Sequence, residues 1–107
     1  MNWAQANRLQ PGDVLTTTAE YDIEAGGLLP EGTVLLFLGR ARLWVSADNE
    51  LVDQDDNEPG DRPRKALHVH VRPGELTDHG HRFPAWMYHD GFYIWGKLAV
   101  HRFEVRQ

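Results

Sequence analysis

Hydrophobic and polar residues alternate in short runs along most of the chain, a pattern typical of β-strands. Glycine, proline, asparagine and aspartate separate the runs, and Gly39-Arg40 is the expected turn between the second and the third. A Leu51-Val52 pair is expected to close a hairpin across residues 47–50. The predicted strands are residues 13–18, 33–38, 41–46 and 66–72, with a final set between 85 and 105.

The first residues have a different pattern. Trp3, Ala6 and Leu9 are spaced by three, which predicts one or two helical turns over residues 2–9, ended by Pro11-Gly12. A helix this short persists only when it docks on the rest of the domain. At 107 residues the chain is expected to form one domain. We predict an all-β, mainly β fold: a small barrel or sandwich of five to seven short strands with this helical turn at its start.

Two segments near the start resemble each other. In Gln10-Pro11-Gly12-Asp13-Val14-Leu15 and again in Leu29-Pro30-Glu31-Gly32-Thr33-Val34-Leu35, a proline-glycine turn begins a strand. A turn, a strand, a long loop and a second strand follow in that order over residues 9–46, which resembles the opening of SH3-like small barrels. The resemblance concerns the fold and assigns no functional residue. Barrels of this kind serve as binding modules more often than as enzymes.

Asp90-Gly91 is the strongest local signal, because Asp-Gly between apolar runs favours a two-residue hairpin turn. Residues paired across such a hairpin share a face, and neighbours along a strand alternate between faces. One face is then expected to carry four large rings, and the other four further side chains. These sets are Trp86, Tyr88, Tyr93 and Trp95 on the first face, and Met87, His89, Phe92 and Ile94 on the second. Either face could supply the core; the other is then covered by the rest of the domain or forms a recognition surface.

Charge is divided unevenly along the chain, which has a net charge of −5. Residues 1–61 hold three basic and twelve acidic side chains, whereas residues 62–107 hold eight basic and four acidic ones. Acidic residues crowd the segment 48–61, which is too polar to pack. We expect Asp53, Asp55, Asp56 and Glu58 to attract a protein partner with a basic surface. The alternative is a solvated loop without a binding role.

The histidines suggest a second hypothesis. His68-Val69-His70 places two imidazoles on one side of a strand, and Glu75, His79 and His81 follow within a dozen residues. Imidazoles and carboxylates are ligands for divalent transition metals. The run from His68 through His70 to Glu75 resembles the first metal motif of cupins, although Gly60 and Gly80 lie at the wrong spacing and no second motif follows. The alternative places both histidines on a solvated strand face.

Other activities are disfavoured. The chain has no cysteine, its one serine is Ser46, and no glycine-rich phosphate loop is present. Direct nucleic-acid binding is not expected, because the net charge is negative and no basic run is interleaved with aromatic residues. The first residues show no export signal and no apolar run is long enough to span a membrane, so we expect a cytoplasmic protein.

Three functional hypotheses follow. The first is a non-catalytic protein-binding module, such as an inhibitor or accessory protein of a phage or mobile element, that uses the aromatic hairpin and the acidic loop and needs no cofactor. The second is a metal-binding, cupin-like barrel or a metal-dependent enzyme that uses the histidine cluster. The third is a structural homo-oligomer whose aromatic face pairs with a second copy.

Overall fold

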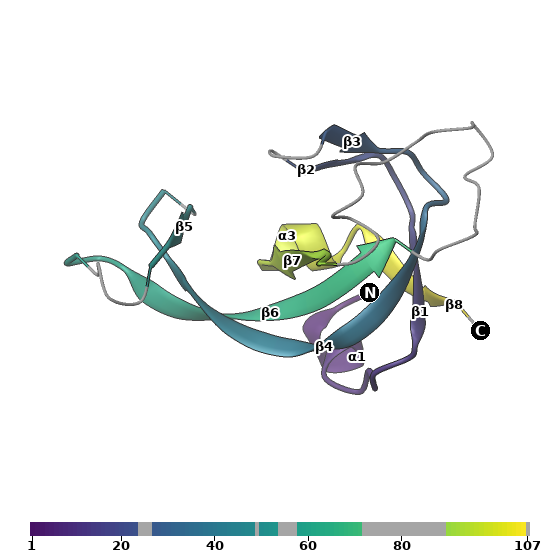
Figure 1. Cartoon of the computed structure of the whole chain (residues 1–107), viewed down its shortest axis with the longest axis horizontal. Helices are drawn as coiled ribbons and strands as arrows, with labels where there is room; N and C mark the ends of the chain where they lie inside the picture. The colour runs from purple at the N-terminus through teal and green to yellow at the C-terminus, as the bar shows by residue number, and fades with distance from the viewer. Residues whose placement is uncertain (24–26, 49, 54–57, 72–89, 107) are drawn as a thin grey trace.

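The computed structural model describes residues 1–23, 27–48, 50–53, 58–71 and 90–106 (Figure 1). Its two helices in these ranges are α1 (Trp3–Ala6) and α3 (Lys97–Val100). Its strands are β1 (Val14–Thr17), β2 (Tyr21–Ile23), β3 (Gly27–Leu29), β4 (Val34–Val45), β5 (Leu51–Val52), β6 (Arg62–Val71), β7 (Phe92–Trp95) and β8 (Phe103–Arg106). The prediction of a mainly β fold that begins with a helical turn is therefore confirmed.

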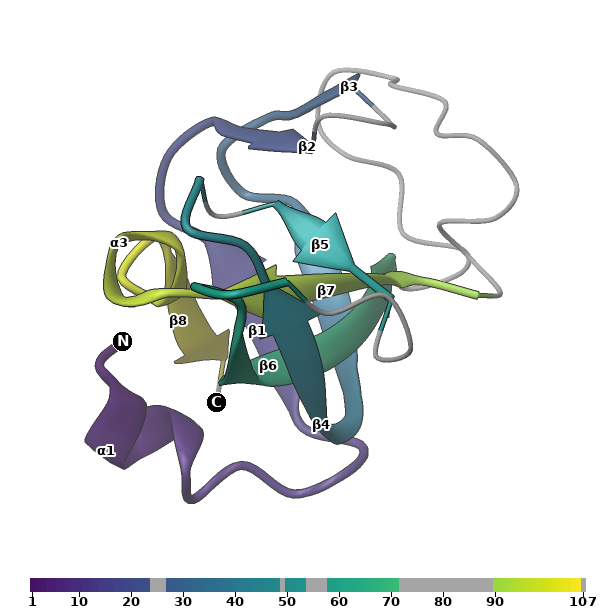
Figure 2. The same cartoon turned by 90° about the vertical axis from the view of Figure 1, so that its left-hand side faces the viewer.

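Most of the strands form one strongly bent antiparallel sheet in the order β7-β6-β4-β1-β8, and β5 pairs with the outer part of β4. Strands β2 and β3 form a separate hairpin, which lies over β7 and α3 (Figures 1 and 2). The pairing of β8 with β1 brings the last described strand back to the first one. No helix in the described part of the chain is long and apolar enough to cross a membrane.

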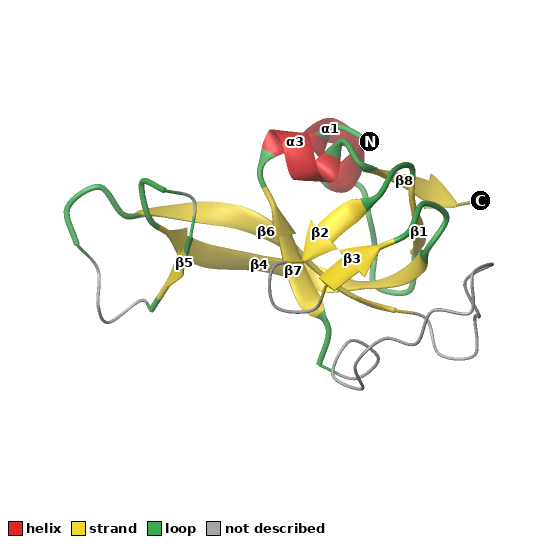
Figure 3. Cartoon of the chain, turned by 90° about the horizontal axis from the view of Figure 1, so that it is seen from above, coloured by secondary structure: helices red, strands yellow, loops and turns green. Residues whose placement is uncertain are grey.

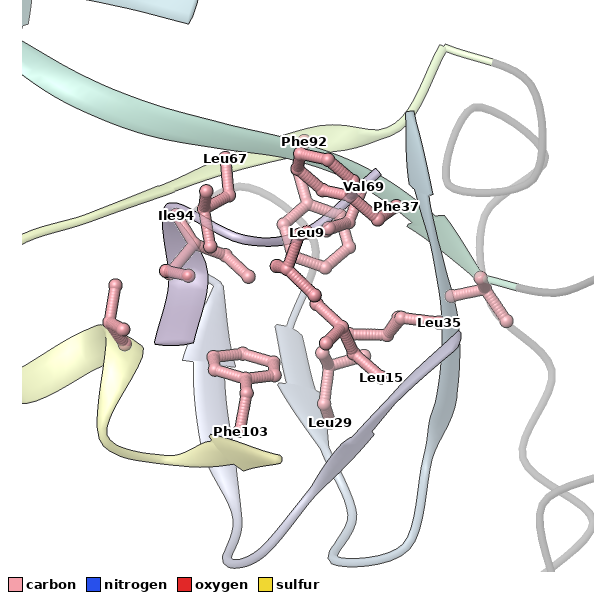
Figure 4. Packing of buried hydrophobic residues seen from close by; sticks show 13 residues of the cluster. Leu9, Leu15, Leu29, Leu35, Phe37, Leu67, Val69, Phe92, Ile94 and Phe103 are labelled. Atoms are coloured by element: carbon pink, nitrogen blue, oxygen red, sulfur yellow. The ribbon is translucent and has the colours of Figure 1, made fainter. Parts of the chain in front are cut away.

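The hydrophobic core lies inside the bend of the large sheet (Figure 4). Alternate residues of β1, β4 and β6 face inward, as a period of two requires, and Leu15, Phe37 and Val69 are fully buried. Phe103 of β8 and Ile94 of β7 close the same cluster, and Ala6 and Leu9 dock the amino-terminal turn onto it. This core fixes the positions of β7 and α3, on which the candidate site depends.

Strand β4 corrects one sequence prediction. We expected Gly39-Arg40 to turn the chain between two strands, but β4 continues through both residues for twelve residues. It pairs with β6 on either side of an irregularity between Phe37 and Gly39. Gly39 is therefore part of a β-bulge, where one extra residue bends the strand without reversing it. A glycine inside a strand pattern predicts a bulge as well as a turn, and pairing with β6 decided between them.

Other boundaries also differ from the prediction. The hairpin closed by Leu51-Val52 is confirmed, with Trp44 opposite Val52. Strand β6 begins at Arg62, four residues before the predicted start at 66. Strands β2 and β3 lie in a segment that was expected to be a loop. Helix α3 interrupts the region expected to contain only strands, because four residues with helical geometry separate β7 from β8.

The outer halves of β4 and β6 extend away from the core. We name this ribbon the arm (Figure 3). It consists of residues 41–45, 51–52 and 62–66. Its outer end carries the exposed acidic residues Asp48, Glu50, Asp53 and Glu58. The arm makes the molecule elongated, with a longest dimension of 44 Å and a shortest of 21 Å. Five cationic side chains lie on residues 40–45 and 62–66, namely Arg40, Arg42, Arg62, Arg64 and Lys65.

Helix α1 is held by its ends. Asn2 caps its start, since the Asn2 side chain accepts from the Gln5 amide and the Gln5 side chain accepts from the Asn2 amide. At the other end the Arg40 guanidinium donates to the carbonyl oxygens of Ala6 and Leu9, at 2.9 and 2.6 Å. Ala6 is the last residue of α1 and Leu9 ends the turn that follows it, so Arg40 fixes the end of α1 to β4.

We expect Arg40→Met to lower the free energy of unfolding by about 1–2 kcal/mol, because it removes two charge-assisted hydrogen bonds and keeps the length of the side chain. Urea denaturation followed by tryptophan fluorescence would measure the change. Arg42→Met is the matched control, since Arg42 is an exposed arginine two residues along the same strand. Equal losses in the two variants would show that Arg40 does not tether α1.

Candidate binding groove

Strand β7 presents two different faces. Phe92 and Ile94 are buried in the core, whereas Tyr93 is 36% exposed and Trp95 is half-buried on the other side. The predicted alternation of Tyr93 and Trp95 against Phe92 and Ile94 is therefore confirmed. The other predicted half of the hairpin, with Trp86, Met87, Tyr88 and His89, lies outside the described residues. The face that carries Tyr93 and Trp95 is the outward one.

The register of β7 against β6 holds these rings in place. Tyr93 lies opposite His68, and their rings stack with centroids 4.6 Å apart and planes 20° apart. The Nε2 atom of His68 is 2.6 Å from the carbonyl oxygen of Asp90. A carbonyl oxygen can only accept, so this ring nitrogen carries the proton. Asp90 lies in a turn directly before Gly91, which has a φ of +73°.

The β2–β3 hairpin forms one wall beside Trp95. Asp22 lies opposite Leu28, and both are exposed, with Leu28 at 49%. Tyr21 and its partner Leu29 anchor the hairpin, since Leu29 is fully buried and the Tyr21 ring meets the Phe103 ring edge-to-face at 5.1 Å. Ile23 also packs against the core, so the wall is held by several residues and presents Asp22 and Leu28 to solvent.

Helix α3 forms the opposite wall. Gly96 has a φ of +91° and a ψ of 150°, a conformation almost restricted to glycine, and it turns the chain from β7 into the helix. Within the helix Val100 is buried, whereas Leu98 is 83% exposed. After the helix, Arg102 donates from its Nη1 atom to the Glu20 carbonyl oxygen at 3.2 Å. This bond connects the end of α3 with the start of β2.

Between these walls lies an open groove of about 620 Å³. Its apolar lining comes from four elements: Tyr21 of β2, Leu28 of β3, Trp95 of β7, and Leu98 and Ala99 of α3. Its charged lining consists of Glu20 and Asp22 on the hairpin side and Lys97 and Arg102 on the helix side. A mostly apolar groove with a few polar groups at its borders is the usual form of a recognition site.

Comparisons with family models, curated proteins and solved structures found no match. The function is therefore argued from the geometry of the groove and from its charges.

The acidic residues predicted to bind a partner lie elsewhere. Asp53 and Glu58 are exposed and lie in the turns at the end of the arm, whereas Asp55 and Asp56 are outside the described residues. Strand β7 pairs with β6 only as far as Ala66, four residues before the arm ends at Arg62. At a strand rise of about 3.3 Å per residue, the outer end of the arm at Arg62 therefore lies roughly 13 Å along β6 from Ala66, the residue opposite Trp95. Within the described ranges, the acidic residues beside Trp95 are Glu20 and Asp22.

Of the predicted metal ligands, His68 and His70 lie on β6, and Glu75, His79 and His81 are outside the described residues. The Nδ1 atom of His70 is 2.8 Å from the carbonyl oxygen of Val71, so this nitrogen also carries a proton. Each imidazole thus has one nitrogen engaged with a backbone carbonyl. The described residues contain no group of three or more side chains able to hold a metal ion.

Of the described residues that line the groove, sequence reasoning identified only Trp95; those it missed include Glu20, Asp22, Leu28 and Leu98. Asp22 and Leu28 lie on β2 and β3, and Glu20 directly precedes β2. The dipeptide Gly26-Gly27, whose second glycine begins β3, also predicts a hairpin turn. Leu98 required the recognition of a helix only four residues long, for which the run Lys97-Leu98-Ala99 of good helix formers after Gly96 is a weak signal.

Proposed function

We propose that the chain is a non-catalytic protein-binding module whose groove takes a large apolar side chain from a protein with a basic surface. The observation that carries the proposal is the exposure of Leu28 and Leu98 on opposite walls of a groove that also contains Trp95. Fully burying a leucine is worth about 1.5–3 kcal/mol, so a side chain seated between these two would gain substantial affinity. Aromatic side chains that become buried when a partner binds, as half-buried Trp95 would, commonly dominate binding energy.

Charge supports a basic partner. Glu20 and Asp22 lie on the hairpin wall, and four further exposed carboxylates, Asp48, Glu50, Asp53 and Glu58, lie at the end of the arm. Such charges raise the rate of encounter with a basic surface and orient it, while the apolar contact supplies most of the affinity. The carboxylates at the end of the arm would thus attract a basic partner through long-range electrostatics as well as by direct contact.

The SH3-like barrel remains our proposal for the finer fold. Strand β1, a long excursion that carries β2 and β3, and then β4 follow in the order of the resemblance noted above. The last described strand, β8, pairs with the first, β1, which also fits this proposal.

Selection of peptides from a displayed random library on the full chain would test the proposed function. We expect enriched peptides to share one large apolar residue with a neighbouring lysine or arginine. We expect Leu98→Ser to weaken their binding at least tenfold, because it removes an apolar contact worth about 1.5–3 kcal/mol. The substitution should leave folding intact, since Leu98 is 83% exposed.

Leu51→Ser is the matched control for this experiment. Leu51 is 50% exposed, but it lies on the arm and outside the groove lining. Peptides that bind Leu98→Ser as tightly as the unchanged chain, or that lose affinity equally with Leu51→Ser, would contradict the proposed function. Light scattering on the same samples would separate binding of a partner from self-association through the groove.

A further inference from the structure

A second, cationic pocket lies on the other side of the turn at Gly96. It measures about 380 Å³ and lies beyond the end of β7, beside the outer part of β6, which pairs there with β4 only. Its described lining consists of Trp3, Pro63, Arg64, Lys65, Gly96 and Lys97. Three of these six residues are cations and none is acidic. The pocket therefore combines positive charge with a half-buried indole ring.

The positive charge of this pocket is not neutralised from within the described part of the chain. No ion pair is found there for Arg64, Lys65 or Lys97, and all three are exposed. Arg42 lies directly opposite Lys65 in the β4–β6 register, which adds a fourth cation on the neighbouring strand. Like charges placed directly opposite each other are destabilising. An anion bound here would relieve that repulsion.

The cationic pocket and the groove share Gly96 and Lys97. Because Gly96 has no side chain, it leaves the surface between them uncovered. Lys97 lines both spaces and is the first residue of α3. An extended segment of a few residues spans about 3.3 Å for each residue, so it could place an apolar side chain in the groove and another residue in the pocket.

We propose that Arg64, Lys65 and Lys97 bind a carboxylate on the same partner segment whose apolar side chain occupies the groove. This inference rests on the proposed function. It gives the segment a direction: an acidic residue on the Lys97 side of the apolar anchor, and basic residues toward Glu20 and Asp22. The two charged borders would make the reversed orientation unfavourable, which gives specificity beyond affinity.

Charge favours a carboxylate over a nucleic acid as the occupant. The chain carries a net charge of −5, and exposed carboxylates lie at the end of the arm. A nucleic-acid strand of a dozen nucleotides would extend over those carboxylates, whereas a short acidic peptide would interact mainly with the cations within a Debye length, about 8 Å at physiological ionic strength. A compact pocket beside an acidic tip therefore suits an acidic side chain of a peptide.

The test uses the full chain labelled with nitrogen-15 and acetylated, amidated tetraglutamate as the probe. We expect saturable shifts of the backbone amides of Lys65, Gly96 and Lys97, with at least tenfold weaker binding to Lys65→Glu. Arg8→Glu is the control of equal charge, since Arg8 is exposed and outside the pocket lining. Tetraglutamate has no apolar side chain, so this result does not depend on the groove and can fail separately from the proposed function.

Three outcomes would overturn the inference. The first is the absence of saturable shifts at those amides. The second is equal weakening of binding by Lys65→Glu and Arg8→Glu, which would show a general charge effect. The third is tighter binding of a twelve-nucleotide oligothymidylate than of tetraglutamate at physiological salt, which would assign the pocket to a nucleic-acid backbone.

Discussion

Gly91→Ala is expected to lower the free energy of unfolding by about 3 kcal/mol, the sum of two separate costs. Gly91 has a φ of +73°, which an alanine adopts only with strain. In addition, a Cβ atom at this position would overlap the carbonyl oxygen of Val69 and lie 3.2 Å from the Nε2 atom of His68. Backbone atoms of β6 cannot move aside as a flexible side chain could, so β7 must shift.

The matched control is Gly12→Ala, and both variants are compared by urea denaturation. Gly12 also has a positive φ, +100°, but a Cβ there would meet nothing within 4 Å. We expect Gly12→Ala to lower the free energy of unfolding by only about 1 kcal/mol, the cost of placing alanine at a positive φ. Because Phe92 pairs with Val69 beside Gly91, the larger loss should also weaken protection of the β7 amides in hydrogen exchange. Equal losses at both glycines would show that β7 does not pack this closely on β6.

Phe103→Ala is expected to lower the free energy of unfolding by about 3–5 kcal/mol, the usual range for truncation of a fully buried phenylalanine. Phe103 is 0% exposed, and its ring meets the Tyr21 ring at an angle of 68°. Its removal would leave a cavity in the core and would remove the ring contact that supports Tyr21, which lines the groove. This single substitution should therefore reduce both stability and the affinity of groove-binding peptides.

Thermal and urea unfolding would measure the stability loss, with Phe103→Leu as the control. Leucine keeps most of the buried apolar volume, so we expect a loss of roughly 1–2 kcal/mol. Peptide affinity is then measured well below the unfolding temperature. A lower affinity of Phe103→Ala under these conditions would show that Tyr21 no longer holds its place in the groove lining. A Phe103→Ala loss below about 1 kcal/mol would contradict the description of this ring as part of the core.

The strand pattern was predictable wherever one face of a strand is buried. The period of two in β1 and at the inner end of β6 follows directly from burial of Leu15, Leu67 and Val69 on one side. The same rule fails on the arm, where Arg62 to Lys65 are all exposed and the strand exists only because it pairs with β4. The pairing of β6 with β4, rather than the local sequence pattern, determined the start of β6 at Arg62 and the bulge at Gly39.

The candidate site was predictable only in part. Alternation about Asp90-Gly91 placed Tyr93 and Trp95 on a common face, because that signal is local, but it did not show which face points outward. The neighbours of Trp95 come from segments that begin 75 residues earlier, at Glu20, and no local pattern could join them. The cationic pocket was missed for the same reason. Its charges are divided between β6 and α3, so the linear sequence showed only an excess of basic residues in its second part.

The most direct test of the groove is photo-crosslinking in the cells that produce the chain, with benzoylphenylalanine introduced at position 98 and, separately, at position 51. Both leucines are exposed, but only Leu98 lines the groove. We predict a discrete adduct from position 98, mapped to a segment with a large apolar residue, and little or none from position 51. Equal adducts from both positions, or adducts from position 51 alone, would contradict the assignment of the groove as the binding site.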